Sequence, residues 1–173
     1  MKEFKINKND SGQRVDKFIL KTVPKLPKSL LYKYIRLKRI KVNKKRCEIS
    51  QVLAENDMVE MYINDEFFEI KKNTEFLTIN SSLNIIYEDE NILIVNKPAG
   101  TDVHRGSQNN KETLIDIIKS YLYQKSEYNP DEENSFSPAI CNRLDRNTTG
   151  LVIAAKNAQS LREINERIRS REI

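Results

Sequence analysis

The charge of this chain changes sign near residue 63, which constrains how the chain can be organised. Residues 1–63 carry 16 Lys and Arg against 7 Asp and Glu, a net charge of +9. Residues 64–173 carry 14 against 18, a net charge of −4. This asymmetry predicts a basic module suited to a polyanion, followed by a second unit with a different surface. The alternative is a lysine-rich surface without a partner, which the clustering of the charge disfavours.

Composition excludes several protein classes. With 38% apolar and 32% charged residues among 173, the chain can form one domain or two small ones. No apolar run is long enough to span a membrane, and residues 1–6 lack a signal-peptide core. We therefore expect a cytoplasmic protein, with Cys47 and Cys141 as reduced thiols. Because His104 is the only histidine, a His-rich metal site is excluded. We expect no metal and no cofactor.

The basic module has the pattern of two helices and a small sheet. Helical spacing of apolar residues runs from Arg14 to Val23, and prolines then interrupt the chain before Ser29, which we expect to cap a second helix. Residues 40–42 and a polar turn at 43–45 indicate half of a hairpin. Residues 57–63 alternate as a closing strand should. The basic residues of the second helix and its exit, which we expect to bind the polyanion, are Lys28, Lys33, Arg36, Lys38 and Arg39.

The rest of the chain has the pattern of a second α+β unit. Residues 64–83 are polar and are interpreted as a linker with an embedded Phe67–Phe68 pair. Strands are predicted at 84–88, 92–97, 138–141 and 151–155, and helices at 113–123 and from Ala158 onward. We expect Asn157 to cap the last helix, Glu163 and Arg167 to pair across one turn of it, and the helix to continue to the last residue without a cap.

The segment Asn142–Gly150 carries the strongest chemical signal. It places Asp145 between Arg143 and Arg146, in a polar turn that leads into the apolar residues 151–155. Two guanidiniums within a few ångströms would keep a carboxylate charged, which suits a nucleophile or a charge stabiliser. The same arginines could grip phosphates. The alternative is a surface ion-pair cluster of little energetic value.

This segment, read as Asn-Arg-Leu-Asp-Arg-Asn-Thr-Thr-Gly-Leu, resembles the signature of the RluA-type pseudouridine synthases, and the segment from Asn96 to Gly100 followed by His104 resembles their upstream block. The resemblance implies that Asp145 is the catalytic aspartate and that Arg143 enters the RNA where the target uridine has left. Arg146 is expected to be a charge partner or phosphate contact, and Lys97 and His104 are expected to line the site. Asn142 departs from the His usual at the head of the signature.

Residues 13–63 resemble the S4 RNA-binding domain, through the segments Arg14–Phe18, Lys28–Ile35, Ile40–Asn43 and Asn56–Glu60. Lys44 and Asn56 stand where that family often has glycine, so the first turn is expected to be built differently. The resemblance implies that the second helix and the turn after it meet structured RNA.

Together these features predict an α+β protein with three parts. An S4-like αα+β domain occupies residues 1–63 (core 13–63), a linker 64–83, and the first part of a mixed or antiparallel-sheet pseudouridine synthase domain 84–173. Because that family's domain continues further, we expect a truncated product or a fragment.

The expected function is isomerisation of uridine to pseudouridine in structured, ribosomal RNA by a monomer without a membrane or metal partner. A non-catalytic S4-type RNA-binding protein, or an inactive fragment of such an enzyme, is the alternative. Glycosidase chemistry is a weaker rival, because it needs two carboxylates and only the distant Asp102 could serve as the second. The sequence names neither the target uridine nor the step in which Asp145 acts.

Overall fold

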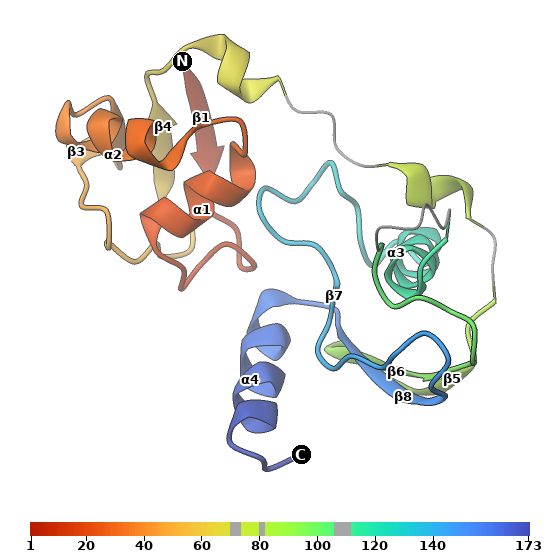
Figure 1. The fold of residues 1–173 in the computed structure, drawn as a ribbon. Coiled ribbons are helices and arrows are strands. Elements are labelled where there is room, and N and C mark those ends of the chain that lie inside the picture. The colour runs from red at the N-terminus through yellow and green to blue at the C-terminus, as the bar shows by residue number, and fades with distance from the viewer. Residues whose placement is uncertain (70–73, 80–81, 106–111) are drawn as a thin grey trace. The chain divides into compact units, whose positions relative to one another are not determined.

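The computed structural model describes residues 1–69, 74–79, 82–105 and 112–173. The chain divides into unit 1, residues 1–72 with 133–135, and unit 2, residues 73–132 with 136–173. Each unit has a four-stranded antiparallel sheet and a hydrophobic core of its own (Figure 1). The expected α+β class is therefore confirmed. No helix in the described part of the chain is long and apolar enough to cross a membrane.

The sheet of unit 1 has the strand order β1-β4-β2-β3, with every neighbouring pair antiparallel. Its strands are β1 (Lys2–Lys5), β2 (Ile40–Val42), β3 (Lys45–Arg46) and β4 (Met58–Met61). Sequence reasoning did not find β1, because Phe4 is the only buried residue in that charged segment. β1 forms an edge of the sheet by pairing with β4.

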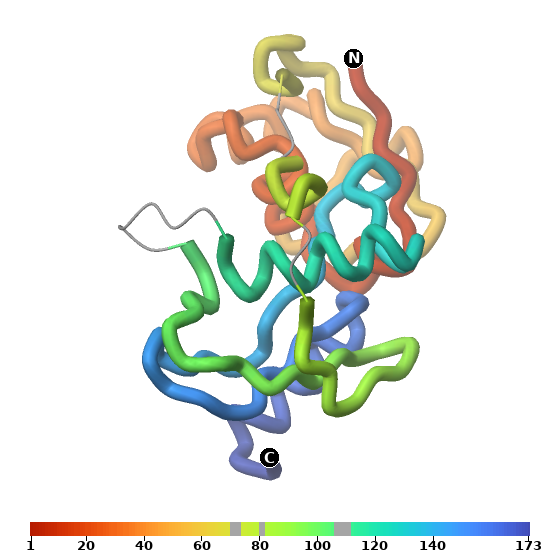
Figure 2. Tube along the Cα trace, turned by 90° about the vertical axis from the view of Figure 1, so that its right-hand side faces the viewer, coloured from red at the N-terminus to blue at the C-terminus, as the bar shows by residue number. Residues whose placement is uncertain are grey.

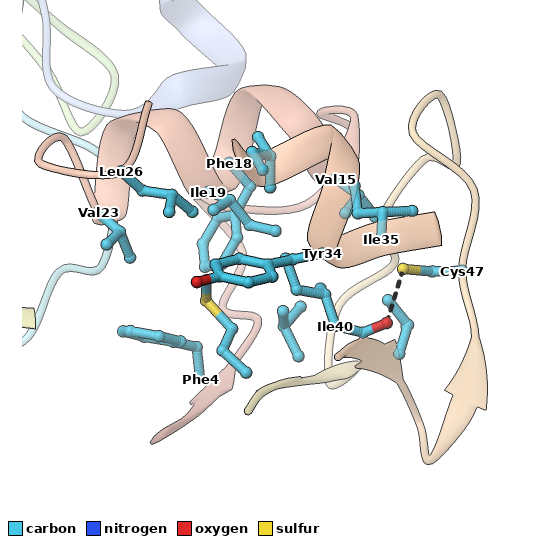
Figure 3. Close-up of a cluster of buried hydrophobic side chains, with 14 of the residues drawn as sticks. Phe4, Val15, Phe18, Ile19, Val23, Leu26, Tyr34, Ile35, Ile40 and Cys47 are labelled. Atoms are coloured by element: carbon cyan, nitrogen blue, oxygen red, sulfur yellow. Dashed lines mark hydrogen bonds between the residues drawn. The ribbon is translucent and has the colours of Figure 1, made fainter. Parts of the chain in front are cut away.

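Unit 1 has two helices, α1 (Val15–Thr22) and α2 (Lys28–Arg36). Both contribute buried apolar side chains to its core. Figure 3 shows their apolar side chains, among them Phe18 and Tyr34, pointing toward strand residues such as Phe4 and Ile40. Full burial of one such large apolar side chain contributes about 1.5–3 kcal/mol. The expectation that Ser29 caps α2 was wrong: Pro27 holds the N-cap position, and Ser29 lies in the first turn.

The hairpin turn of unit 1 is closed by two non-glycine residues in the left-handed region. Asn43 and Lys44 have φ of 51° and 64° and connect β2 to β3. The pairing of Val42 with Lys45 leaves a two-residue loop, and positive φ at both central residues is the type I′ pattern. The Asn43 side chain accepts from the Met58 amide at 2.8 Å, and the Lys44 amide donates to Glu60 Oε2 at 2.7 Å. These bonds hold a lysine where glycine would fit without strain.

The segment after β4 packs back onto unit 1. It contains a short 3-10 helix, η1 (Asp65–Phe68), whose Phe67 and Phe68 are partly buried against the core. The rings of Phe4 and Phe68 lie 6.3 Å apart. Phe68, which sequence analysis placed in the linker, therefore lies beside the buried residue of β1.

The sheet of unit 2 has the strand order β5-β6-β8-β7. Its strands are β5 (Ile85–Glu88), β6 (Ile92–Lys97), β7 (Ala139–Ile140) and β8 (Gly150–Ala155). Helix α3 (Leu114–Gln124) packs with the 3-10 helix η2 (Glu75–Thr78), whose Phe76 is buried in this core. Figure 2 follows this part of the chain from the green segment of β5 and β6 to the blue segment of β8.

The last helix, α4 (Ala158–Arg169), begins as predicted: Asn157 Oδ1 accepts from the Ser160 amide at 2.8 Å. The predicted pair of Arg167 with Glu163 is also formed, at 2.7 Å. The expectation that the helix runs to the last residue without a cap was wrong. Arg171 has φ of 59°, and the amides of Arg171 and Glu172 donate to the carbonyls of Ile168 and Arg167. This is the Schellman arrangement that ends many helices.

A charged network joins several elements of unit 2. Glu88 on β5 accepts hydrogen bonds from Tyr121 at 2.7 Å, Lys125 at 2.7 Å and Lys156 at 3.1 Å. Lys125 and Lys156 also pair with Glu127. Burial raises the pKa of Glu88, but these hydrogen bonds outweigh it and lower the pKa to about 2. The network fastens β5 to α3, to the segment after it and to the end of β8.

Both cysteines are free thiols, as expected. Cys47 is buried in unit 1 and its thiol donates a weak hydrogen bond to the Ile40 carbonyl at 3.5 Å (Figure 3). Burial raises the pKa of both thiols.

Candidate functional site

The strand pairing of unit 2 brings two distant sequence segments together. β6 and β8 run antiparallel with Lys97 opposite Gly150. The loop that follows β6 and the turn that precedes β8 therefore leave the sheet at the same end. In Figure 2 the blue turn between β7 and β8 lies beside the green segment that follows β6. The upstream block and the signature segment thus form one site.

Lys97 is the residue that fastens these segments. Its side chain is fully buried, and its ammonium donates to the carbonyl oxygens of Arg146 at 2.8 Å and Pro98 at 3.1 Å. Burial lowers the pKa of Lys97, while the nearby carboxylates of Asp102 and Asp145 act in the opposite direction. The Lys97 ammonium therefore links the two segments through these carbonyls. Its positive charge also attracts the Asp145 carboxylate.

Gly100 and Arg146 add a second tie between loop and turn. The Gly100 amide donates to the Arg146 carbonyl at 2.9 Å, and Arg146 Nε donates to the Gly100 carbonyl at 3.2 Å. Gly100 has φ of +85°, a conformation that side chains rarely adopt. The Arg146 carbonyl therefore accepts from both Lys97 and Gly100, and its guanidinium already has a partner in the loop.

Asp145 lies on the surface of this turn. Its side chain is exposed, and its backbone carbonyl accepts from the Thr148 amide at 3.0 Å. The two flanking arginines do not hold it as expected: within the described residues, no ion pair of 4 Å or less joins Asp145 to Arg143 or Arg146. The reason is local, because Arg146 turns toward Gly100. The carboxylate is thus open to a ligand.

The Asn142 side chain hydrogen-bonds to the backbone of β8 and has a structural role. Its Oδ1 accepts from the Ile153 amide at 2.8 Å, and its Nδ2 donates to the Leu151 carbonyl at 3.0 Å. The Cys141 amide donates to the Ile153 carbonyl at 2.8 Å. The Cys141 backbone and the Asn142 side chain therefore continue the pairing with β8 beyond Ile140. In this chain the residue at the head of the signature fixes the start of the turn.

Arg143 and His104 are both exposed near this turn. The pKa of His104 is lowered by burial first, and then by the positive charges of Arg143 and Lys119, against the opposing charge of Asp116. Positive charges thus act on His104 in the same direction as burial, and one negative charge opposes them. Sequence reasoning missed Lys119, because it occupies one position of an apolar helical pattern and no motif includes it.

A cavity of about 350 Å³ lies beside the tie made by Lys97. Asp145 does not line it, so this hollow and the candidate carboxylate are separate features of the surface. The residues around the cavity are Ser82, Leu83, Asn84, Asn96, Lys97, Pro98 and Thr149.

Unit 1 presents the predicted basic surface by itself. All five residues predicted to bind the polyanion are exposed: Lys28, Lys33, Arg36, Lys38 and Arg39. Lys28 lies 5.7 Å from the Tyr32 ring and Arg39 lies 5.5 Å from the Tyr34 ring, positions in which the cations stay available to solvent. The exposed residues Lys44, Lys45 and Arg46 continue this charge along the hairpin; sequence reasoning had assigned the first two only to a turn.

The described residues contain no group of three or more His, Cys, Asp or Glu side chains arranged to hold a metal ion.

Comparison with known proteins shows which sequences this chain is similar to. Residues 91–173 match the family model described as RNA pseudouridylate synthase. The chain is 45% identical over 158 residues to an uncharacterized RNA pseudouridine synthase of Mycoplasma capricolum subsp. capricolum, covering 91% of this chain and 51% of that protein. It is 34% identical over 174 residues to the ribosomal large subunit pseudouridine synthase C of Buchnera aphidicola subsp. Baizongia pistaciae, covering 97% and 51% respectively.

A solved structure described as human RNA pseudouridylate synthase domain containing 4 is 23% identical, with a TM-score of 0.39 over 51% of this chain and 30% of that chain. The chain spans about half the length of the curated relatives it matches.

Proposed function

Because the chain is related by sequence to RNA pseudouridine synthases, we propose that it carries the RNA-binding module and the first part of the catalytic domain of such an enzyme. Asp145 is its catalytic carboxylate. The observation that carries this proposal is the exposed Asp145 side chain on a turn fastened twice to the loop after β6, inside the segment that matches the family.

The reaction explains why such a carboxylate is needed. Pseudouridine forms when the bond between uracil N1 and ribose C1′ breaks, the base rotates, and a bond forms between C5 and C1′. The isomerisation adds and removes no atoms overall, because the proton lost from C5 is balanced by one gained at N1. The target nucleotide must leave its stack, which costs a few kcal/mol. Asp145 then acts on the sugar or base, and Arg143 enters the space that the nucleotide has left.

The backbone ties give this turn its position. Lys97 and Gly100 both donate to the Arg146 carbonyl, one residue after Asp145. A catalytic group must be held close to its productive geometry, because a misplacement of about 1 Å can cost 100-fold in rate. Lys97 is therefore a positioning residue, and its charge also attracts the carboxylate.

The basic surface of unit 1 is the proposed contact with structured RNA. The S4-like assignment rests on the matching segments of residues 13–63 and is supported by two helices packed on a small antiparallel sheet. Ribosomal RNA is the proposed substrate, because a relative with 34% identity is named as a ribosomal large subunit enzyme. We also propose that the protein is a monomer and lies in the cytoplasm, where ribosomes are found.

The experiment uses residues 1–173 joined to the part of the Mycoplasma capricolum relative that follows the matched segment. Pseudouridine is measured by mass spectrometry after incubation with unmodified ribosomal RNA. We expect product from this chimera and none above background from its Asp145→Asn variant. If the chimera and its Asp145→Asn variant form pseudouridine at equal rates, Asp145 is not the catalytic carboxylate.

Binding of RNA without catalysis is the second candidate for residues 1–173. The observation that favours it is the separate sheet and core of unit 1, which presents the basic surface without help from the signature turn. The two candidates differ in one result: the chimera described above makes pseudouridine under the first and only binds RNA under the second.

A further inference from the structure

The sheet of unit 1 carries an exposed aromatic ring that has no role in the account given so far. Tyr62 directly follows β4, and 41% of its side chain is exposed. Among the described residues of unit 1, it belongs neither to the core nor to the partly buried residues packed against that core. Single exposed tyrosines are common on protein surfaces, so the neighbours of the ring decide what this one can do.

The strand register places Tyr62 on the side of the sheet that faces away from the core. Its amide donates to the Arg39 carbonyl at 2.8 Å, which extends the pairing of β4 with β2 by one residue. The preceding residue, Met61, is buried in the core. Because side chains alternate along a strand, Tyr62 points to the opposite face, together with Glu60 and its strand partner Lys41.

Two contacts hold the Tyr62 ring on this face. The Lys41 ammonium lies 5.2 Å from the centroid of the ring, and the phenol hydroxyl donates to Glu60 Oε1 at 3.4 Å. The other carboxylate oxygen of Glu60 accepts from the Lys44 amide at 2.7 Å. No described residue forms an ion pair of 4 Å or less with Lys41. A ring that is both exposed and held in place loses little conformational freedom when a flat ligand stacks on it.

The charge across this face changes from acidic to basic between β1 and β3. Residues that lie opposite one another on successive strands of the sheet are Glu3, Glu60, Lys41 and Arg46. The basic side is continuous with the RNA surface proposed above, because Arg39 of that surface is the strand partner of Tyr62. An RNA backbone is therefore attracted to the β2 side of the ring, and a base attached to that backbone can lie over it.

Exposed aromatic side chains on sheets are a common means of binding unpaired bases, with cations nearby that hold the backbone. We propose that Tyr62 stacks on one unpaired base of the RNA that unit 1 binds, and that Lys41 contacts the phosphate beside this base. The inference deepens the proposed function and rests on it, because it specifies that the bound RNA includes a single-stranded nucleotide. Every base has a face that can stack, so this contact selects unpaired RNA without reading its sequence.

The test compares the binding of two RNA probes by residues 1–173. One probe is a stem-loop with a uridine-rich loop, and the other is a blunt duplex with the sequence of its stem. Tyr62→Ala should weaken stem-loop binding about fivefold or more, as loss of one base–aromatic stack does, and should leave duplex binding unchanged. Tyr62→Phe keeps the ring and should bind like the wild type. Tyr123→Ala, which removes a tyrosine of unit 2 that is also 41% exposed, is the matched control.

Salt dependence separates stacking from charge. Lys41→Gln should make the dependence of log K on log salt shallower by about 0.7, the value for one phosphate contact on a single strand. Tyr62→Ala should leave this slope unchanged, because stacking releases no counterion. In the wild-type complex, we expect nuclear Overhauser effects between the ring protons of Tyr62 and the protons of a loop base. Their absence from the complex would contradict the stack.

The outcomes distinguish this inference from the function on which it rests. If Tyr62→Ala binds the stem-loop as tightly as the wild type, or weakens stem-loop and duplex binding equally, the stacking site is overturned and RNA binding by unit 1 stands. If residues 1–173 bind neither probe, both the stacking site and the proposed RNA contact are overturned. Circular dichroism and an unchanged melting temperature verify that each variant retains the fold.

Discussion

The Lys97 ammonium donates a hydrogen bond to the backbone carbonyl of Arg146 across 2.8 Å, although the two residues are 49 positions apart in the chain. The pairing of β6 with β8 makes this contact possible, since it sets Lys97 opposite Gly150 at the end of the sheet. The bond holds the carbonyl immediately after Asp145. A fully buried cation of unit 2 therefore holds the carbonyl that directly follows an exposed candidate carboxylate.

Substitution of Lys97 by methionine should loosen the site without unfolding the unit. Methionine keeps most of the buried volume and removes a charge whose burial is costly, but it cannot donate to Arg146 or Pro98. We expect the Gly100 amide, which shares the Arg146 carbonyl, to exchange about tenfold faster, which corresponds to about 1.4 kcal/mol. Hydrogen exchange followed by NMR measures this. Lys17→Met on the exposed side of α1 is the control, and equal Gly100 rates in wild type and Lys97→Met would contradict the role of the tie.

The Glu88 network predicts a specific loss of stability in acid. The pKa of Glu88 is lowered from 4.5 to about 2, because hydrogen bonds from Lys125, Tyr121 and Lys156 outweigh the effect of burial. A carboxyl group with a lower pKa in the folded state stabilises the fold above its unfolded pKa. This contribution should be lost as the pH falls from 4.5 to about 2.

The test compares wild type with Glu88→Gln by urea unfolding at several pH values. The free energy of unfolding of the variant should be lower at pH 7 and should converge on that of the wild type at the acid end of the window. Parallel pH profiles for the two proteins would show that the network does not act in this way.

The hairpin turn predicts opposite effects at two adjacent lysines. Lys44 has φ of 64°, which costs about 1 kcal/mol for a residue with a side chain. Lys44→Gly should therefore stabilise unit 1 by about 0.5–1 kcal/mol. Lys45→Gly removes the same charge from β3, where glycine is unfavourable, and should destabilise it. Thermal unfolding followed by circular dichroism compares them, and a lower melting temperature for Lys44→Gly would count against the strained turn.

The basic surface predicts how RNA binding responds to charge reversal. Arg36→Glu and Arg39→Glu together should weaken binding of structured RNA at least tenfold at low salt. They should also make the dependence of log K on log salt shallower by about one for each lost phosphate contact. Lys17→Glu, on the exposed side of α1, is the matched control. If the salt dependence of binding is unchanged in the double variant, the RNA interface lies on another part of unit 1.

Much of the fold could be predicted from the sequence, because most elements have a clear periodicity. The helices at 113–123 and after Asn157 and the strands around 92–97 and 151–155 were found within a few residues. β1 was not, because a short edge strand with one buried residue has no such period. The termination of α4 was missed because Arg171 adopts a conformation for which glycine is the usual signal.

The two motifs that the structure brings together were predictable from the sequence, but their contacts were not. The sequence motif identifies Asp145, Lys97 and Arg146, and it suggests that both arginines pair with the aspartate. In the structure the Arg146 guanidinium donates to Gly100 instead. Partners of this kind depend on which loop the strand pairing brings alongside, and the order of residues in a motif carries no such information.

The measurement that tests the account most directly is pseudouridine formation by the chimera of residues 1–173, with and without Asp145→Asn, alongside RNA affinity. The account predicts that the substitution abolishes product while the affinity for ribosomal RNA stays within about twofold, since the carboxylate acts on the extruded nucleotide and the basic surface holds the rest. Product formation that survives the loss of this carboxylate would contradict it.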